Sequence, residues 1–210
     1  MGEIVESPLS RDSSLKRLDE CNSIYCVVSP TATTSPFKPR GYASSAGRID
    51  IVARCMYVLS AFSGRVCFMG ALLGPPSPPK LVLDTKPRYS SEREAAVELS
   101  RALKRGGSGS ILVLEESIEK VLLEAKRLGF ALTLLREDGV SVLENLSLIE
   151  GRRLFLLGSQ VDIPEHIESY AISLGASVVS VGPVSLHTEH VIAFIEWLRE
   201  TSRARGTRLD

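Results

Sequence analysis

Short apolar runs alternate with segments of helical periodicity through the C-terminal half of the chain. The runs have the length of strands and lie at 111–114, 132–135, 154–157 and 177–181. Apolar residues at helical spacing fill the segments 117–128, 165–174 and 186–201. This alternation predicts an α/β fold with a mostly parallel sheet and helices on both faces. Because ligands of such sheets bind beyond the carboxyl ends of the strands, the candidate site lies after Leu135, Leu157 and Val181.

The N-terminal half predicts three strands and two helices. Strands are expected at 23–28, at 66–73 and around Leu81, and helices at 48–62 and 92–104. The prolines between the first strand and the first helix forbid regular structure there. The run 66–73 is almost entirely apolar, which is typical of a buried parallel strand.

The length of 210 residues fits a single domain. We expect that domain at 23–201, preceded by a polar, serine-rich extension at 1–22 and followed by a short tail at 202–210. No apolar run approaches the roughly 20 residues of a membrane span, and the N-terminus lacks the pattern of a secretory signal. The expected location is therefore the cytoplasm.

The common nucleotide and hydrolase motifs do not fit. The glycine-rich turn at 106–109 precedes a strand, whereas a dinucleotide loop follows a strand and opens a helix. The sequence has neither a GxxxxGK[ST] phosphate loop nor a GxSxG nucleophile elbow. These observations exclude a nucleotide-dependent kinase, a Rossmann dehydrogenase and an α/β-hydrolase.

The four cysteines do not have the spacing of a metal site. Cys55 and Cys67 lie in apolar surroundings and are expected to be core residues, whereas Cys21 and Cys26 could pair in an oxidising environment. His187 and His190 would need a third ligand and are interpreted as packing residues at the start of the last helix, with Ser185 as its N-cap. We therefore predict no structural metal.

The net charge of zero hides an uneven distribution. Residues 36–105 carry 12 basic and 5 acidic side chains, a net charge of +7, whereas 1–35 and 106–210 have net charges of −2 and −5. A basic middle third is compatible with a surface that faces a polyanion, although a solvated face balanced by an acidic neighbour explains it equally well.

Three stretches of the sequence resemble one known family. They are Ser-Ala-Gly-Arg-Ile-Asp at 45–50 with the helix that follows, Leu-Leu-Gly-Pro-Pro-Ser-Pro-Pro-Lys at 72–80, and Ser-Val-Gly-Pro-Val-Ser-Leu-His-Thr-Glu-His at 180–190. Together, and in this order, they resemble the archaeal tRNA (pseudouridine(54)-N(1))-methyltransferases of the SPOUT superfamily. The resemblance extends from about Ser23 to Glu200.

The resemblance implies a fold, a cofactor and a reaction. It implies a deep trefoil knot within about 130–200, a homodimer, and S-adenosylmethionine as the donor that methylates N1 of pseudouridine 54 in the T-loop of tRNA. The family's cofactor contacts correspond here to Leu135, Gly158, Val181, Gly182, Pro183, Val184, Ser185, Leu186 and Val191.

Some positions depart from the family pattern. Val191 stands where cysteine is usual, Arg136 stands where histidine is usual, and Ser159 and Gln160 follow Gly158 where aspartate is common. Contacts made by the backbone should survive these changes. The changes leave the shape of the pocket undetermined by the resemblance.

Asp50 and Arg48 are the candidates for the acceptor side. Asp50 begins a helix and could take the N1 proton or orient the base, and Arg48 could hold a phosphate or a developing anion. Tyr42 could stack on an extruded base. The basic side chains expected to bind RNA are Lys38, Arg40, Arg54, Arg65, Lys80, Lys86 and Arg88.

Two other functions remain open from the sequence. One is N1-methylation of a pseudouridine in ribosomal RNA, and the other is a non-catalytic RNA-binding or assembly module. The intact Arg48 and Asp50 argue against the second alternative.

Overall fold

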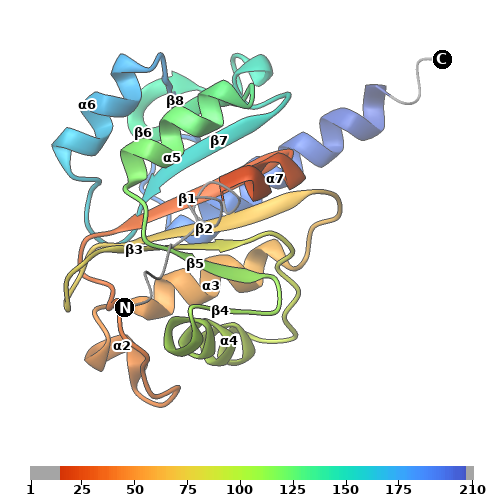
Figure 1. Cartoon of the computed structure of the whole chain (residues 1–210). Coiled ribbons are helices and arrows are strands. Elements are labelled where there is room, and N and C mark those ends of the chain that lie inside the picture. The colour runs from red at the N-terminus through yellow and green to blue at the C-terminus, as the bar shows by residue number, and fades with distance from the viewer. Residues whose placement is uncertain (1–14, 207–210) are drawn as a thin grey trace, which may run out of the picture.

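The computed structural model describes residues 15–206, in which one eight-stranded sheet runs through the molecule (Figure 1). The strand order from edge to edge is β4-β5-β3-β2-β1-β7-β6-β8. The strands are β1 Ser23–Ser29, β2 Val66–Leu72, β3 Lys80–Asp84, β4 Gly107–Ser108, β5 Ile111–Leu114, β6 Ala131–Ser141, β7 Arg153–Gly158 and β8 Ser177–Ser180. The five strands from β2 to β8 in this order pair in parallel, and β3, β4 and β5 extend the sheet in antiparallel pairs. The predicted α/β fold with a mostly parallel sheet is confirmed.

Helices cover both faces of this sheet. They are η1 Lys16–Glu20, α2 Tyr42–Ser45, α3 Ile49–Leu59, α4 Glu92–Arg105, α5 Ile118–Arg127, η2 Leu146–Leu148, α6 Glu165–Ser173 and α7 Thr188–Gly206. The apolar side chains of α3, α4 and α7 form one core with Tyr25 and Phe68, whereas those of α5 and α6 form a second core with Ile24 and Met69. Neighbouring strand residues enter opposite cores because strand side chains alternate between the two faces.

The largest differences from the predicted elements lie around the candidate site. β6 extends to Ser141, beyond the predicted strand at 132–135, with an irregularity after Leu135 before it pairs with β8 again at Val140. The last helix begins at Thr188 and not at Leu186, so Ser185 is not its N-cap. The carbonyl of His187 accepts the first hydrogen bonds, from the amides of His190 and Val191.

The described parts of the two terminal segments contain helix. Leu15 and Leu18 are buried in the second core, so the predicted extension at 1–22 includes a turn of helix that packs on the domain. At the other end α7 continues to Gly206, five residues beyond the predicted domain boundary. Residues 1–14 and 207–210 lie outside the described part of the chain.

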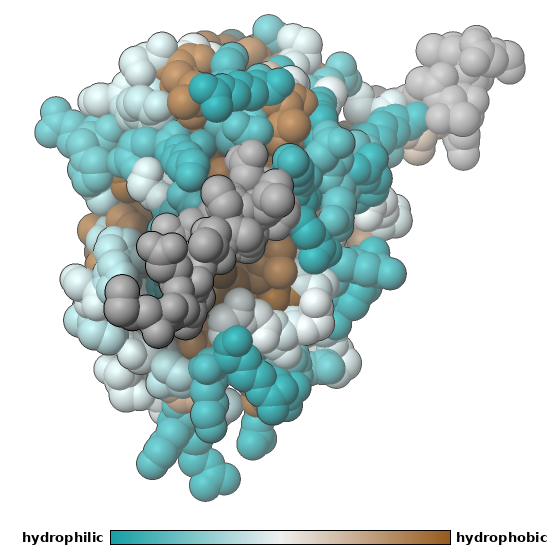
Figure 2. Space-filling view, viewed as in Figure 1, coloured by the Kyte–Doolittle hydropathy of each residue, from teal (hydrophilic) through white to brown (hydrophobic). Residues whose placement is uncertain are grey.

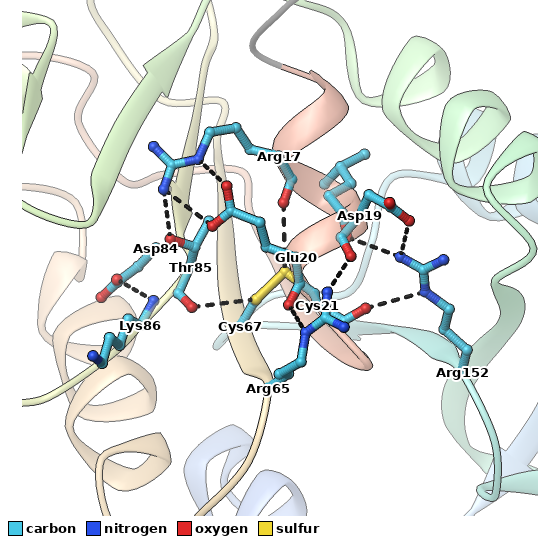
Figure 3. Close-up of a disulfide and its surroundings, with 11 residues drawn as sticks. Arg17, Asp19, Glu20, Cys21, Arg65, Cys67, Asp84, Thr85, Lys86 and Arg152 are labelled. Atoms are coloured by element: carbon cyan, nitrogen blue, oxygen red, sulfur yellow. Dashed lines mark hydrogen bonds and ion pairs between the residues drawn. A yellow bond between two sulfur atoms is a disulfide. The ribbon is translucent and has the colours of Figure 1, made fainter.

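A disulfide fastens the N-terminal turn to the sheet. Cys21 pairs with Cys67 of β2, with 5.8 Å between their Cα atoms (Figure 3). The suggested Cys21–Cys26 pair is therefore wrong, and Cys67 is not a free core thiol. Cys26 lies on β1 with its side chain in the second core, and burial raises the pKa of its thiol to about 12.

Reduction should lower the thermal stability markedly. The disulfide closes a loop with a sequence separation of 46, and loop-closure entropy then stabilises the fold by about 4 kcal/mol. We expect the melting temperature to fall by roughly 10 °C in reductant. The Cys67→Ser variant is the control, since reductant should leave its melting temperature unchanged. Four free thiols in the denatured, unreduced protein would contradict the pairing.

Ionic groups are buried beneath α7. The carboxylate of Glu196 accepts a hydrogen bond of 2.7 Å from the hydroxyl of Tyr25 and forms an ion pair of 3.2 Å with Arg199. The Arg199 guanidinium donates to the carbonyls of Ile149 and Gly151, and burial lowers its pKa. These contacts join α7 to β1 and to the turn before β7.

Hydrophilic side chains predominate on the face seen in Figure 2, where apolar residues gather in small patches. None of the helices within 15–206 has the length and apolar character needed to cross a membrane. The same residues contain no cluster of three or more His, Cys, Asp or Glu that could hold a metal ion.

Candidate functional site

A cavity of about 650 Å³ lies at the carboxyl ends of β6, β7 and β8. Its walls come from the irregular part of β6, the segment from β7 to α6, and the loop from β8 to α7. This is the position that the alternation of strands and helices predicts.

Most of the predicted cofactor residues line this cavity. Those that do are Leu135, Gly158, Val181, Gly182, Val184, Ser185, Leu186 and Val191. Pro183 belongs to the same loop but does not itself line the cavity. Residues from three segments far apart in the sequence therefore meet at one place.

The loop after β7 is held in place by its own backbone and by α7. A Cβ at Gly158 would lie 3.0 Å from the carbonyl oxygen of Val161, which is tighter than an ordinary contact, so a larger residue would require the loop to shift slightly. The Thr188 hydroxyl donates a hydrogen bond of 2.9 Å to the carbonyl of Gly158. The buried hydroxyl of Ser159 has no hydrogen-bond partner within the described residues and lies at the cavity. A bound ligand could satisfy this hydroxyl.

The rim of the cavity is acidic. Arg136 is paired there with Asp138 and with Glu168, at 3.4 Å from the latter. Its guanidinium lowers the pKa of Asp138, and Asp138 in turn raises the pKa of Arg136. The other acidic side chains at the cavity are Glu137, Asp162 and Glu165. This rim favours a ligand with cationic groups and disfavours phosphates.

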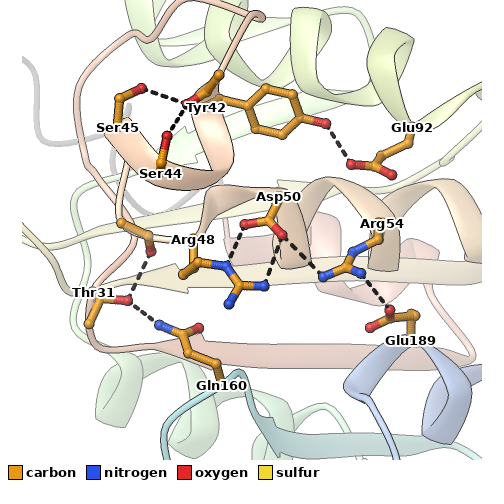
Figure 4. A network of polar contacts seen from close by, with 12 residues as sticks. Thr31, Tyr42, Ser44, Ser45, Arg48, Asp50, Arg54, Glu92, Gln160 and Glu189 are labelled. Carbon is orange, nitrogen blue, oxygen red and sulfur yellow. Dashed lines mark hydrogen bonds and ion pairs between the residues drawn. The ribbon is translucent and has the colours of Figure 1, made fainter.

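A chain of alternating charges ends at Glu189 (Figure 4), whose neighbour Thr188 lines the cavity. Arg48 donates to both oxygens of Asp50, at 3.0 and 3.1 Å, and Arg54 donates to Asp50 Oδ2 at 3.1 Å. The other end of the Arg54 guanidinium pairs at 3.1 Å with Glu189, in the first turn of α7. Asp50 and Glu189 are 8% and 7% exposed. The hydrogen bonds that Arg48 donates to the Asp50 carboxylate raise the pKa of Arg48.

The turn before α3 explains how Arg48 reaches Asp50. Gly47 and Arg48 both have φ of +63°, and Arg48 is the only residue other than glycine with positive φ among the described residues. A Cβ at Gly47 would lie 1.7 Å from the carbonyl oxygen of Thr31. The hydroxyl of Thr31 donates to the Gly47 carbonyl at 2.9 Å and accepts a hydrogen bond from Gln160. The turn thereby contacts the loop after β7.

The structure separates the basic residues predicted to bind RNA into two groups. Lys38, Arg40, Arg54 and Lys80 lie toward the carboxyl edge of the parallel strands, as the strand directions require. Arg65, Lys86 and Arg88 lie at the opposite edge, where the Arg65 guanidinium donates to the carbonyls of Asp19 and Glu20 (Figure 3). The second group is not brought together with the cavity.

Tyr42 is not a free stacking platform. Its hydroxyl donates to Glu92 at 2.6 Å, its ring lies 5.8 Å from that of Phe37, and burial raises its pKa. The exposed rings of His187 and His190 contact each other edge to face at 5.6 Å beside the loop from β8 to α7.

Sequence reasoning missed the roles of Glu189 and Arg54 in the charge chain. Arg54 was predicted to bind RNA, and no role in the site was predicted for Glu189. The available signal was the presence of Glu189 within 180–190, a stretch in which most of the other residues line the cavity.

The sequence model of a family described as "Putative SAM-dependent RNA methyltransferase" matches residues 23–204. The tRNA (pseudouridine(54)-N(1))-methyltransferase of Aeropyrum pernix is 34% identical over 186 residues, which cover 84% of this chain and 94% of that protein. The enzyme of the same name from Methanosarcina mazei is 30% identical over 189 residues, with coverage of 84% and 88%.

Among solved structures, the crystal structure of Archaeoglobus fulgidus Nep1 bound to S-adenosylhomocysteine has a TM-score of 0.63. The sequences are 17% identical, and the match covers 87% of this chain and 99% of that chain. At this identity the likeness concerns the fold.

Proposed function

The chain belongs to the family of SAM-dependent RNA methyltransferases, and we propose that it methylates N1 of pseudouridine 54 in the T-loop of tRNA. The observation that carries the proposal is that the segments around the cavity contact the region of an arginine–aspartate pair by two routes. One route runs through Glu189, and the other runs through Gln160. The names of the relatives at 34% and 30% identity support this substrate.

The residues at the cavity fit S-adenosylmethionine. Leu135, Val181 and Leu186 offer apolar walls to an adenine, and the hydroxyl of Ser159 offers an unused polar group. The acidic rim suits the sulfonium and ammonium charges of this molecule. When bound, S-adenosylmethionine supplies an electrophilic methyl group.

The charge chain faces the acceptor in this proposal. Pseudouridine N1 carries a proton that must leave, whereas uridine N1 is bonded to ribose. A carboxylate has about four acceptor sites, of which Asp50 uses three for the two arginines. The remaining site on Oδ1 can accept the N1–H, while Arg48, Lys38 and Arg40 bind the RNA backbone.

Two tRNA substrates test this proposal. The protein is incubated with labelled S-adenosylmethionine and with tRNA that carries either pseudouridine or uridine at position 54. We expect label only in the pseudouridine-containing tRNA. Equal labelling of both would overturn the N1 assignment. Ribosomal RNA that contains pseudouridine is offered as a third substrate. Label in ribosomal RNA alone would favour the first alternative from the sequence, and label in no RNA would favour the second.

We also propose that the protein works as a homodimer. Trp197 of α7 is 57% exposed, its ring lies 6.5 Å from that of Phe194, and Tyr57 of α3 is exposed as well. Exposed aromatic rings of this size are typical of interfaces. We expect light scattering to give the mass of a dimer, and the Trp197→Lys variant to give more monomer. A monomer at every concentration of the unmodified protein would contradict the proposal.

We further propose a trefoil knot within about 130–200, which the family resemblance implies, and a location in the cytoplasm, which the sequence predicts. The described elements of that segment are β6, β7, α6, β8 and the start of α7.

A further inference from the structure

We propose that Glu189 is a positioning residue for methyl transfer, because it fixes Arg54 and, through Arg54, the carboxylate of Asp50. This inference rests on the proposed function and extends it to a residue outside the cavity lining. Glu189 pairs with Arg54 Nη1 at 3.1 Å, and Arg54 Nη2 donates to Asp50 at the same distance.

The place of Glu189 in α7 connects it to the cofactor cavity. Thr188, its neighbour in the chain, lines the cavity and donates to the carbonyl of Gly158. Val191, two residues further on, also lines the cavity. The first turn of α7 thus contacts the donor side through Thr188 and Val191, and α3 through Glu189.

The burial of this pair makes its geometry specific. Glu189 is 7% exposed, and the side chain of Arg54 is 30% exposed, so water screens their attraction less than at an open surface. A guanidinium held by two carboxylates has a fixed plane, and this plane determines where Asp50 Oδ2 lies. Displacement of a reacting group by about 1 Å can cost on the order of a hundredfold in rate.

Charge alone and positioning predict opposite effects on RNA binding. Loss of the Glu189 charge leaves the site more positive, so charge alone predicts tighter binding of RNA. Positioning predicts weaker binding, because Arg54 and Arg48 lose their arrangement. The sign of the change therefore separates the two explanations.

The test is a double-mutant cycle of Glu189→Gln and Arg54→Gln. Glu189→Gln keeps the size of the side chain and removes its charge. We expect kcat with saturating tRNA to fall by about tenfold or more, while the affinity for S-adenosylmethionine stays within about threefold. The S-adenosylmethionine-free protein should bind a pseudouridine-containing T-arm oligonucleotide more weakly. The double variant should lose no more than Arg54→Gln alone, because Glu189 acts through Arg54.

Glu200→Gln is the matched control, since Glu200 lies on the same helix and bonds to Ser63 away from the charge chain. It should leave kcat and RNA affinity unchanged. An unchanged kcat in Glu189→Gln, tighter RNA binding, or additive losses in the double variant would overturn the inference. If the unmodified protein binds the T-arm without methylating it, the proposed function fails, and the cycle measured on RNA affinity still tests the role of Glu189.

Discussion

The Asp50→Asn variant should methylate pseudouridine-containing tRNA at least about a hundredfold more slowly than the unmodified protein. Asparagine keeps the size of the side chain, but its amide cannot take a proton from N1 and replaces one acceptor oxygen with a donor. That donor would face the guanidinium groups of Arg48 and Arg54, which now bond to the carboxylate at 3.0 and 3.1 Å. Single-turnover rates with saturating S-adenosylmethionine and tRNA measure the effect.

Binding of S-adenosylmethionine should separate this effect from general damage. Asp50 does not line the cavity, so calorimetry should give nearly the same affinity for the variant and the unmodified protein. Asp19→Asn is the control, because it breaks an exposed ion pair with Arg152 at the opposite edge of the sheet and should leave the rate unchanged. Full activity of Asp50→Asn would contradict a role for Asp50 in the reaction and would leave it only as a negative charge in the first turn of α3.

The Glu196→Ala variant should lose about 3–5 kcal/mol of unfolding free energy. It leaves the guanidinium of Arg199, which is 1% exposed, without its buried counter-charge. It also leaves the hydroxyl of Tyr25 without its acceptor. For a chain of this length the loss corresponds to a melting temperature lower by roughly 10 °C. Thermal and urea unfolding provide the two measurements.

Two further variants keep this prediction testable. Glu200→Ala removes a carboxylate of α7 that bonds to Ser63 at the surface, and should cost much less stability. If Glu196→Ala does not fold, Glu196→Gln should fold with an intermediate loss, because its amide oxygen still accepts from Tyr25. Equal stability of Glu196→Ala and the unmodified protein would contradict the role assigned to the buried ionic groups.

Periodicity in the sequence predicts the strands and helices well, because the burial of apolar side chains determines both the periodic pattern and the position of each element. The buried strands β2 and β7 and the serine-capped helices α4 and α5 lie within a residue or two of their expected ranges. The irregularity of β6 at 136–139 is not predictable in this way, since it depends on pairing with β8 on either side of this polar segment, at Leu135 and at Val140.

The family resemblance predicts the cavity residues, and so does the rule that ligands bind beyond the carboxyl ends of parallel strands. Neither predicts the charge chain. Arg54 and Glu189 are 135 positions apart in the sequence, and their ion pair depends on how α7 packs against α3. The disulfide likewise depends on the contact of the N-terminal turn with β2, which no local pattern encodes.

Nucleoside mass spectrometry tests the central claim most directly. tRNA with pseudouridine at position 54 is incubated with the protein and isotopically labelled S-adenosylmethionine, then digested and mapped. The proposed function predicts one labelled methyl group on N1 of pseudouridine 54 and none on other nucleosides. A methyl group on another atom or another nucleoside, or unmodified tRNA, would contradict it.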